Sequence, residues 1–132
     1  MEFSKENIDD LLYIKVETIK ATYWEADYFN ELLTKEIGLG KRKFIIDLSN
    51  CKIIDPPFLS TLILFYKKVI KLGGNVKIVK PLEFLSQNEG IKNSLNLFEL
   101  LNTKNDALDS YKTIFTIPAE EMFYPKISTI AS

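Results

Sequence analysis

Apolar and polar positions along the chain switch between the repeat of a strand and the repeat of a helix. Within residues 11–19, apolar and polar side chains alternate from Tyr13 onward, which predicts a half-buried strand. Residues 24–37 then repeat their apolar side chains every three or four positions, which predicts a helix with one buried face. Gly38 and Gly40 supply the left-handed residue that ends such a helix.

The middle of the chain repeats this order with stronger signals. Residues 44–48 form a short apolar run without alternation, typical of a central parallel strand that is covered on both faces. Asp55 is a good N-cap, and Pro56 and Pro57 are tolerated in the first turn that follows, so we predict the longest helix at residues 56–72. Gly73 and Gly74 end it.

The last third predicts shorter elements. These are a strand at residues 75–79, a helix from Leu82 to about Gln87, a strand at residues 97–100, and a final helix that starts at residues 103–106 and continues through Tyr111. Strands and helices therefore alternate with short connections. This order predicts an α/β fold: a single small sheet, mostly parallel, of about four to five strands with helices packed on it.

The helix predicted at residues 56–72 carries a leucine on its polar side. At about 100° per residue, Leu62 and Ile70 fall on the core side. Leu64 falls in the middle of the polar side, with Phe65 at the rim. A single exposed leucine is ordinary, but an exposed phenylalanine beside it favours contact with a partner. The polar neighbours of Leu64 are Ser60, Thr61, Lys67, Lys68 and Lys71.

Composition excludes several kinds of site. The 132 residues are 46% hydrophobic and 27% charged, which predicts one globular domain. The sequence has no histidine, which excludes a Ser-His-Asp triad and a histidine metal ligand. One cysteine, Cys51, excludes an internal disulfide. No apolar run approaches a membrane span, the N-terminal residues do not resemble a signal peptide, and we expect a cytoplasmic protein.

The net charge of −1 hides an uneven distribution. Residues 1–34 hold three lysines against eight acids, net −5, and residues 81–132 hold four lysines against seven acids, net −3. Residues 35–80 hold ten basic residues against three acids, net +7. This basic segment indicates either an anionic partner or lysines that solvate one face and stabilise helix C-termini.

The ordered set of segments resembles the STAS domain of bacterial anti-sigma-factor antagonists. The resemblance rests on Phe-Ile-Ile-Asp-Leu-Ser at residues 44–49, on Asp-Pro-Pro-Phe-Leu-Ser-Thr-Leu at residues 55–62, and on the Gly-Gly and strand at residues 73–79. The segments at residues 96–101 and 106–108 are similar to the family's last strand and helix. The resemblance implies a STAS-like domain over residues 1–112, with residues 113–132 as a C-terminal extension.

One departure from the family pattern bears on function. In the family, the residue after this aspartate is the serine or threonine that a partner kinase phosphorylates, whereas here it is Pro56, which has no hydroxyl. Phe58 replaces the family's glycine. Ser60 and Thr61 lie one turn further along, either as alternative phosphorylation sites or as ordinary solvated hydroxyls.

The resemblance implies a non-enzymatic regulatory module of bacterial signalling and transcription regulation, with no cofactor and no metal. Its partner would be a protein, either a kinase-like anti-sigma factor or a scaffold, and a homodimer stays open. The alternative is a STAS-like accessory subunit of a membrane transporter or of a lipid-transport ABC complex. We expect neither nucleic-acid binding nor direct membrane insertion. The expected partner-binding residues are Asp55, Pro56, Pro57, Phe58, Ser60, Thr61, Leu64, Lys67 and Lys68.

Several remaining residues have two interpretations. Asp47 and Asp55 lie at strand and loop ends, where α/β proteins often place catalytic sites, so they could act as an acid–base pair. The alternative is structural: Asp47 ends a strand and bonds to turn amides, and Asp55 is the N-cap of a helix. Cys51 reads as a buried small hydrophobe rather than a redox sensor. Trp24 and its tyrosine neighbours read as core or rim, since nearby acids have the wrong sign for nucleic acid. Residues 113–132 could cover a sheet edge, pair with a second copy, or be disordered.

Overall fold

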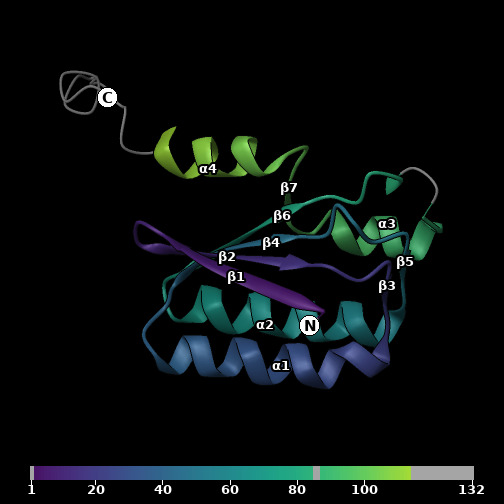
Figure 1. Ribbon diagram of the computed structural model, residues 1–132, viewed down its shortest axis with the longest axis horizontal. Coiled ribbons are helices and arrows are strands. Elements are labelled where there is room, and N and C mark those ends of the chain that lie inside the picture. Colours follow the sequence, from purple (N-terminus) through teal and green to yellow (C-terminus); the bar gives the residue numbers. More distant parts are fainter. Residues whose placement is uncertain (1, 85–86, 114–132) are drawn as a thin grey trace.

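The computed structural model describes residues 2–84 and 87–113, which fold into a sheet with helices on both faces (Figure 1). The main sheet has five strands in the order β1-β2-β4-β6-β7; β1 runs antiparallel to β2, and the other neighbours are parallel. Strands β3 and β5 form a separate parallel pair. In chain order the elements are β1 (Phe3–Ile8), β2 (Leu11–Val16), β3 (Lys20–Ala21), α1 (Tyr23–Gly38), β4 (Lys43–Asp47), β5 (Ile53–Ile54), α2 (Pro56–Lys71), β6 (Asn75–Val79), α3 (Glu89–Leu95), β7 (Glu99–Leu101) and α4 (Lys104–Thr113).

This architecture confirms the predicted α/β class and its mostly parallel sheet. Three of the predicted helices correspond to α1, α2 and α4, and four of the predicted strands correspond to β2, β4, β6 and β7. The glycines behave as expected at the helix ends, because Gly40 and Gly73 have φ values of 96° and 84°.

Strand β1 was not predicted, because its sequence lacks a hydrophobic pattern. Only Phe3 at its start is buried, and the four residues that follow it are exposed. A two-residue turn pairs β1 with β2, and Asp9 in that turn has φ 53°, a conformation that aspartate tolerates. An edge strand that contacts the core with one face only, and is rich in charge, gives no periodic signal.

The helix predicted at residues 82–87 is not an α-helix in the described part of the chain. Residues 82 and 83 form a turn, Phe84 has the tighter 3-10 conformation, and residues 85 and 86 lie outside the described part; the α-helix of this region is α3. Asn88 caps α3 by accepting a hydrogen bond from the Ile91 N–H at 2.9 Å. The short helix packs against α2 through Ile91, which is buried.

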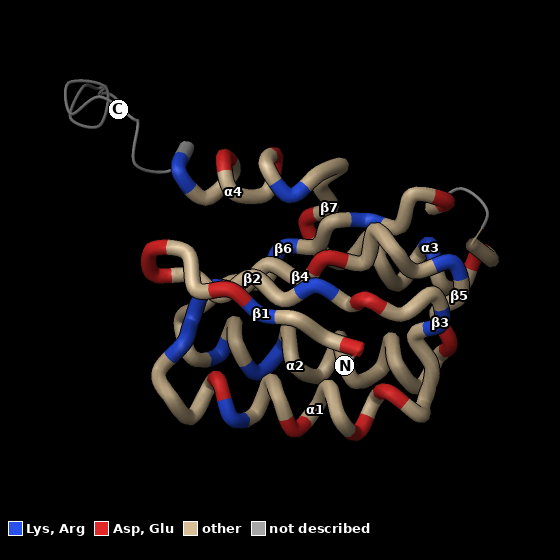
Figure 2. Tube along the Cα trace, viewed as in Figure 1, with Lys and Arg blue, Asp and Glu red and all other residues tan. Residues whose placement is uncertain are grey.

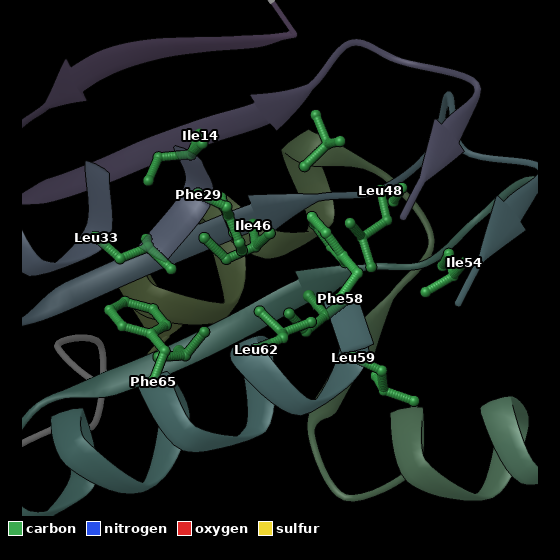
Figure 3. Close-up of a cluster of buried hydrophobic side chains, with 14 of the residues drawn as sticks. Ile14, Phe29, Leu33, Ile46, Leu48, Ile54, Phe58, Leu59, Leu62 and Phe65 are labelled. Carbon is green, nitrogen blue, oxygen red and sulfur yellow. The ribbon is translucent and has the colours of Figure 1, made fainter. Parts of the chain in front are cut away.

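Helices α1, α2 and α3 cover one face of the sheet and enclose the main core (Figure 3). The prediction that Phe65 lies at an exposed rim is wrong: the side chain is 5% exposed and its ring meets Phe44 edge-on at 4.9 Å. Ile70, expected in the core, is instead exposed. The buried face of α2 is therefore turned toward Phe65 relative to the expected one, which leaves Leu64 and Ile70 exposed.

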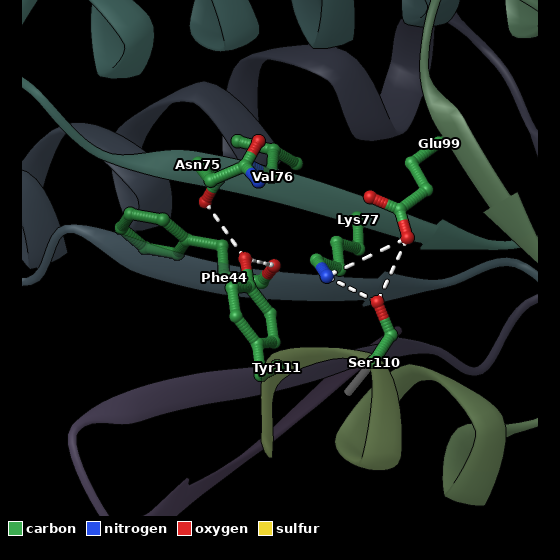
Figure 4. Close-up of polar contacts among 7 residues, drawn as sticks. All are labelled: Phe44, Asn75, Val76, Lys77, Glu99, Ser110 and Tyr111. Atoms are coloured by element: carbon green, nitrogen blue, oxygen red, sulfur yellow. Dashed lines mark hydrogen bonds and ion pairs between the residues drawn. The ribbon is translucent and has the colours of Figure 1, made fainter. Parts of the chain in front are cut away.

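Helix α4 covers the opposite face, where the contacts are partly polar (Figure 4). Ala107 and Tyr111 pack on Ile45 of β4 in a small second core. The Tyr111 hydroxyl donates to the Phe44 carbonyl at 2.9 Å. Buried Lys77 of β6 donates to the Ser110 hydroxyl. Beyond α4, the predicted extension at residues 113–132 lies outside the described residues from 114 onward.

Candidate functional site

The Asp55 turn joins the first turns of α1 and α2. One carboxylate oxygen of Asp55 accepts from the Phe58 N–H at 3.0 Å, as predicted for an N-cap. The other accepts from the Tyr23 N–H of α1 at 2.9 Å. Each helix has its positive dipole end here, so the carboxylate stabilises both. Its role in the structure is to fix the geometry of the turn.

Backbone pairing holds the same turn from the other side. The Asp55 N–H donates to the Ala21 carbonyl at 3.0 Å, next to the pairing of β3 with β5. Helix α1 begins independently at a capping box, in which the Thr22 N–H donates to the Glu25 carboxylate at 2.8 Å and the Thr22 side chain in turn accepts from the Glu25 N–H. The two helix starts are thus anchored before any partner is present.

Pro56 and Pro57 occupy the first two positions of α2, and both are exposed. Neither needs an intrahelical hydrogen bond there, and each fixes its own φ. The position directly after Asp55 therefore presents a rigid apolar ring instead of a hydroxyl.

Phe58 is not part of this surface, although we expected it among the partner-binding residues. Its side chain is fully buried and stacks on Phe29 of α1, with ring centroids 5.0 Å apart (Figure 3). The bulky residue in place of the family's glycine fills space between the two helices. It belongs to the core.

The outer face of α2 presents an apolar side chain within a basic surrounding. Leu64 is 67% exposed. Ser60 lies one turn before it, and Lys67 and Lys68 lie one turn after it, all three exposed. Thr61 is half-buried and donates its hydroxyl to the Pro57 carbonyl at 3.2 Å, so Ser60 is the more accessible of the two expected hydroxyls.

A groove of about 270 Å³ runs between α2 and α3 beside this face. Pro56 and Ser60 line it, as do Ile63 and Gly90. The sequence analysis did not identify the residues of α3 that form one side of this groove, because it did not predict that helix. The signal available in the sequence was Asn88, an N-cap residue followed by Glu89 in the first turn.

Aromatic residues on α1 extend the surface on the other side of Asp55. The expectation that Trp24 and its tyrosine neighbours are core or rim residues is wrong for Trp24, which is 74% exposed; its ring lies 4.5 Å from that of Tyr23. Both rings line an open depression that also contains Ile19 and Asp55. The sequence carried the signal, since a step of about 100° per residue sets Trp24 about 140° from buried Phe29.

Asp47 and Cys51 have structural roles here. Asp47 is buried, and its carboxylate accepts from the Tyr13 hydroxyl at 2.5 Å and from the Ser49 N–H at 2.9 Å. Burial raises the pKa of the Cys51 thiol to about 12, opposite to the lowered pKa that a reactive cysteine needs. Within residues 2–84 and 87–113, no group of three or more carboxylate or cysteine side chains is placed to hold a metal ion.

Solved structures with this fold are identified by structural similarity. An anti-sigma factor antagonist from Mycobacterium paratuberculosis has a TM-score of 0.64 and 20% identity, over 82% of this chain and 91% of that chain. The Bacillus cell fate determinant SpoIIAA, in its phosphorylated form, has a TM-score of 0.64 and 10% identity, over 83% of this chain and 98% of that chain.

A domain of a membrane protein is also similar. The murine anion transporter solute carrier 26 family member A9 has a TM-score of 0.60 and 11% identity, over 82% of this chain and 18% of that chain. No protein-family model and no curated protein matches the sequence. The chain therefore has the STAS fold of the anti-sigma factor antagonists, as the sequence resemblance predicted.

Proposed function

We propose that this chain, which has the fold of the anti-sigma factor antagonists, is a non-enzymatic regulatory module that binds a protein partner through the Asp55 turn and the outer face of α2. The partner is a kinase-like anti-sigma factor or a scaffold protein. The contact residues are Pro56, Pro57, Ser60, Thr61, Leu64, Lys67 and Lys68, with Asp55 holding the turn in place.

The observation that carries the proposal is the exposure of Leu64. A leucine that leaves two-thirds of its surface in water contributes little to folding. It gains free energy when a partner covers it, and the lysines around it suit an acidic rim. Two exposed prolines and the groove beside α3 continue the same surface.

The proposed binding is constitutive with respect to residue 56. Proline has no hydroxyl to phosphorylate, and it reduces the conformational freedom that a turn loses on binding. Ser60 remains the accessible hydroxyl for a modification on this face, while the Thr61 hydroxyl is engaged with the helix backbone. Peptide mass spectrometry of the native protein tests whether the face is modified elsewhere: a phosphate on Ser60 or Thr61 would make binding conditional on that residue instead of on residue 56.

Affinity purification with mass spectrometry tests the main proposal. Leu64→Asp is expected to keep the fold and lose the captured partner, because it places a carboxylate where an apolar pocket must close. Leu97→Asp is the matched control, since Leu97 is 62% exposed and lies between α3 and β7. Equal capture by wild type and both variants contradicts the proposal. Pro56→Ser tests whether a kinase-like partner then phosphorylates the turn.

A role as an accessory subunit of a membrane transporter is the second candidate. The similarity to a domain of the murine anion transporter favours it. No helix in the described part of the chain is long and apolar enough to cross a membrane. The same purification separates the two candidates: an ATPase or transporter subunit supports this one, and a kinase-like protein supports the first.

A further inference from the structure

Helix α1 carries a second exposed surface, on the side that faces away from α2 and the sheet. Three exposed residues lie three, four and seven positions after Trp24, so all four share one side of the helix over about 10 Å: Asp27, Tyr28 and Glu31. All four are exposed, and Tyr28 is 54% exposed. We call these four residues the α1 strip. Figure 2 shows acidic positions recurring along the outward side of α1.

The two carboxylates of the α1 strip are not used by the fold. Among residues 2–84 and 87–113, neither Asp27 nor Glu31 forms an ion pair, and no lysine or arginine lies over the Trp24 or Tyr28 ring. The neighbouring Glu25, by contrast, is occupied by the capping box. The strip therefore presents two exposed aromatic rings between carboxylates that form no ion pair. The Trp24 ring contacts that of Tyr23, and exposed Lys35 lies one turn after Glu31.

We propose that the α1 strip binds an arginine-bearing segment of a protein partner. A guanidinium stacks on an aromatic face and pairs with a carboxylate at the same time, and the strip offers these two kinds of group in alternation. A purely apolar partner would leave Asp27 and Glu31 buried without compensation. Nucleic acid and anionic membrane surfaces have the wrong charge.

A second copy of this chain fits the strip poorly. Arg42 is the single arginine in the sequence. It is half-buried and donates to the carbonyls of Ile37 and Lys41 at 3.1 and 2.8 Å. The inference concerns a different helix from the proposed α2 surface and does not depend on it.

Trp24 is the only tryptophan of the chain, so its emission reports directly on the strip. The probe is a capped 13-residue Ala/Gln peptide with three arginines spaced four apart, added to the full chain at low ionic strength. We expect a saturable change in emission, several-fold weaker binding when lysine replaces arginine, and no binding when glutamate replaces it. Absence of saturable binding by the arginine peptide overturns the proposal, as does equal binding by the glutamate peptide.

Variants locate the binding on the strip. Asp27→Asn with Glu31→Gln is expected to raise the Kd at least tenfold, and Tyr28→Ala about fivefold. The matched control removes two exposed carboxylates elsewhere, Glu83→Gln with Asp106→Asn, and is expected to change the Kd less than twofold. An equal loss in the control pair overturns the proposal, because it indicates attraction by net charge alone.

Two further measurements separate competing outcomes. Leu64→Asp is expected to bind the peptide like wild type, so a failure of the α2 proposal is distinguishable from a failure of this one. Sedimentation velocity of the chain alone is expected to show no association that involves the strip. A dimer that Trp24→Ala dissociates overturns the proposal in favour of a second copy as the occupant.

Discussion

Asp55 shows how one side chain can organise a binding surface without being its contact residue. Its carboxylate satisfies backbone N–H groups of two helices, from Phe58 and from Tyr23. The bond to Phe58 could be predicted from the sequence, since it follows from an N-cap before Pro-Pro. The bond to Tyr23 could not, because it depends on the pairing of β3 with β5, two-residue strands that have no sequence pattern.

Phe58 provides a prediction about stability at a position expected to bind a partner. Phe58→Ala is expected to lower the free energy of unfolding by about 3–5 kcal/mol, because the ring is fully buried against Phe29. Leu64→Ala is the control and is expected to cost less than about 1 kcal/mol at its exposed site. Urea denaturation measures both. A cost for Phe58→Ala as small as that of the control would contradict a core role.

Cys51 provides a prediction about alkaline pH. Burial raises the pKa of its thiol from 9.0 to about 12, so between these pH values the unfolded chain loses the proton while the folded chain keeps it. The unfolded state is therefore favoured as the pH rises above about 9, and the thiol's contribution to stability is complete only below that. Relative to Cys51→Ala, wild type is expected to lose about 1 kcal/mol between pH 7 and pH 10.

Paired urea titrations at the two pH values measure this loss. Tyr13 and Tyr111 also have pKa values raised by burial, but both are present in the variant and cancel in the comparison. A difference between wild type and Cys51→Ala that is the same at both pH values would show that the thiol is accessible to water.

At the scale of elements, helices whose ends carry their own signals were predictable. Thr22 and Asp55 cap α1 and α2, and glycines follow both helices. The buried face of each helix was harder to predict, because the sequence does not show which strand or helix packs against it. Phe65 lies at the rim of a helical projection, yet Phe44 of the central strand brings it into the core. Strand β1 and helix α3 have too few buried residues to show a period.

The Gly-Gly pair after α2 provides a prediction for this scale. Gly73 is required because its φ is 84°, a conformation that favours glycine. Gly74 is required because a side chain does not fit: a Cβ at Gly74 would lie 2.1 Å from the Arg42 carbonyl oxygen and 2.7 Å from Val69. Gly74→Ala is therefore expected to lower the free energy of unfolding by about 1–3 kcal/mol or more, because the backbone at Arg42 or at residue 74 must move to make room.

Gly38→Ala is the matched control at the end of α1. A Cβ there meets nothing within 4 Å, and its backbone is helical, so the substitution is expected to be neutral or stabilising by up to about 1 kcal/mol. Thermal unfolding of both variants measures the contrast. Equal effects from the two substitutions would contradict the close approach of Arg42, the residue before β4, to the turn after α2.

At the scale of the whole molecule, the two faces of the sheet are built differently. The face under α1, α2 and α3 holds most of the buried apolar side chains. The face under α4 holds a smaller cluster together with buried Lys77, whose ammonium lies 3.5 Å from the Glu99 carboxylate. The alternating strands and helices predicted a sheet covered on both faces, but not this asymmetry. It arises because a lysine and an aspartate, Asp47, point inward from the central strands.

This asymmetry predicts that α4 opens before the rest of the domain. Its apolar attachment consists mainly of Ala107 and Tyr111, with Leu108 partly buried beside them, and polar contacts exposed at their edges complete it. Because little apolar surface is exposed when α4 leaves, its opening costs less free energy than global unfolding. Native-state hydrogen exchange is expected to give a lower free energy of opening for α4 amides than for those of α2.

Tyr111→Phe tests the cause of that attachment, because it deletes only the hydroxyl that donates to the Phe44 carbonyl and leaves the ring in place. It is expected to lower the protection of α4 by about 1 kcal/mol while the α2 amides change less. If α4 and α2 instead exchange with one common free energy, and the variant lowers both equally, then the two faces unfold as one unit. In that case α1 and α2, which carry the exposed Leu64 and Trp24, would be no more stable to opening than α4. Opening of α4 would then also remove both proposed binding surfaces.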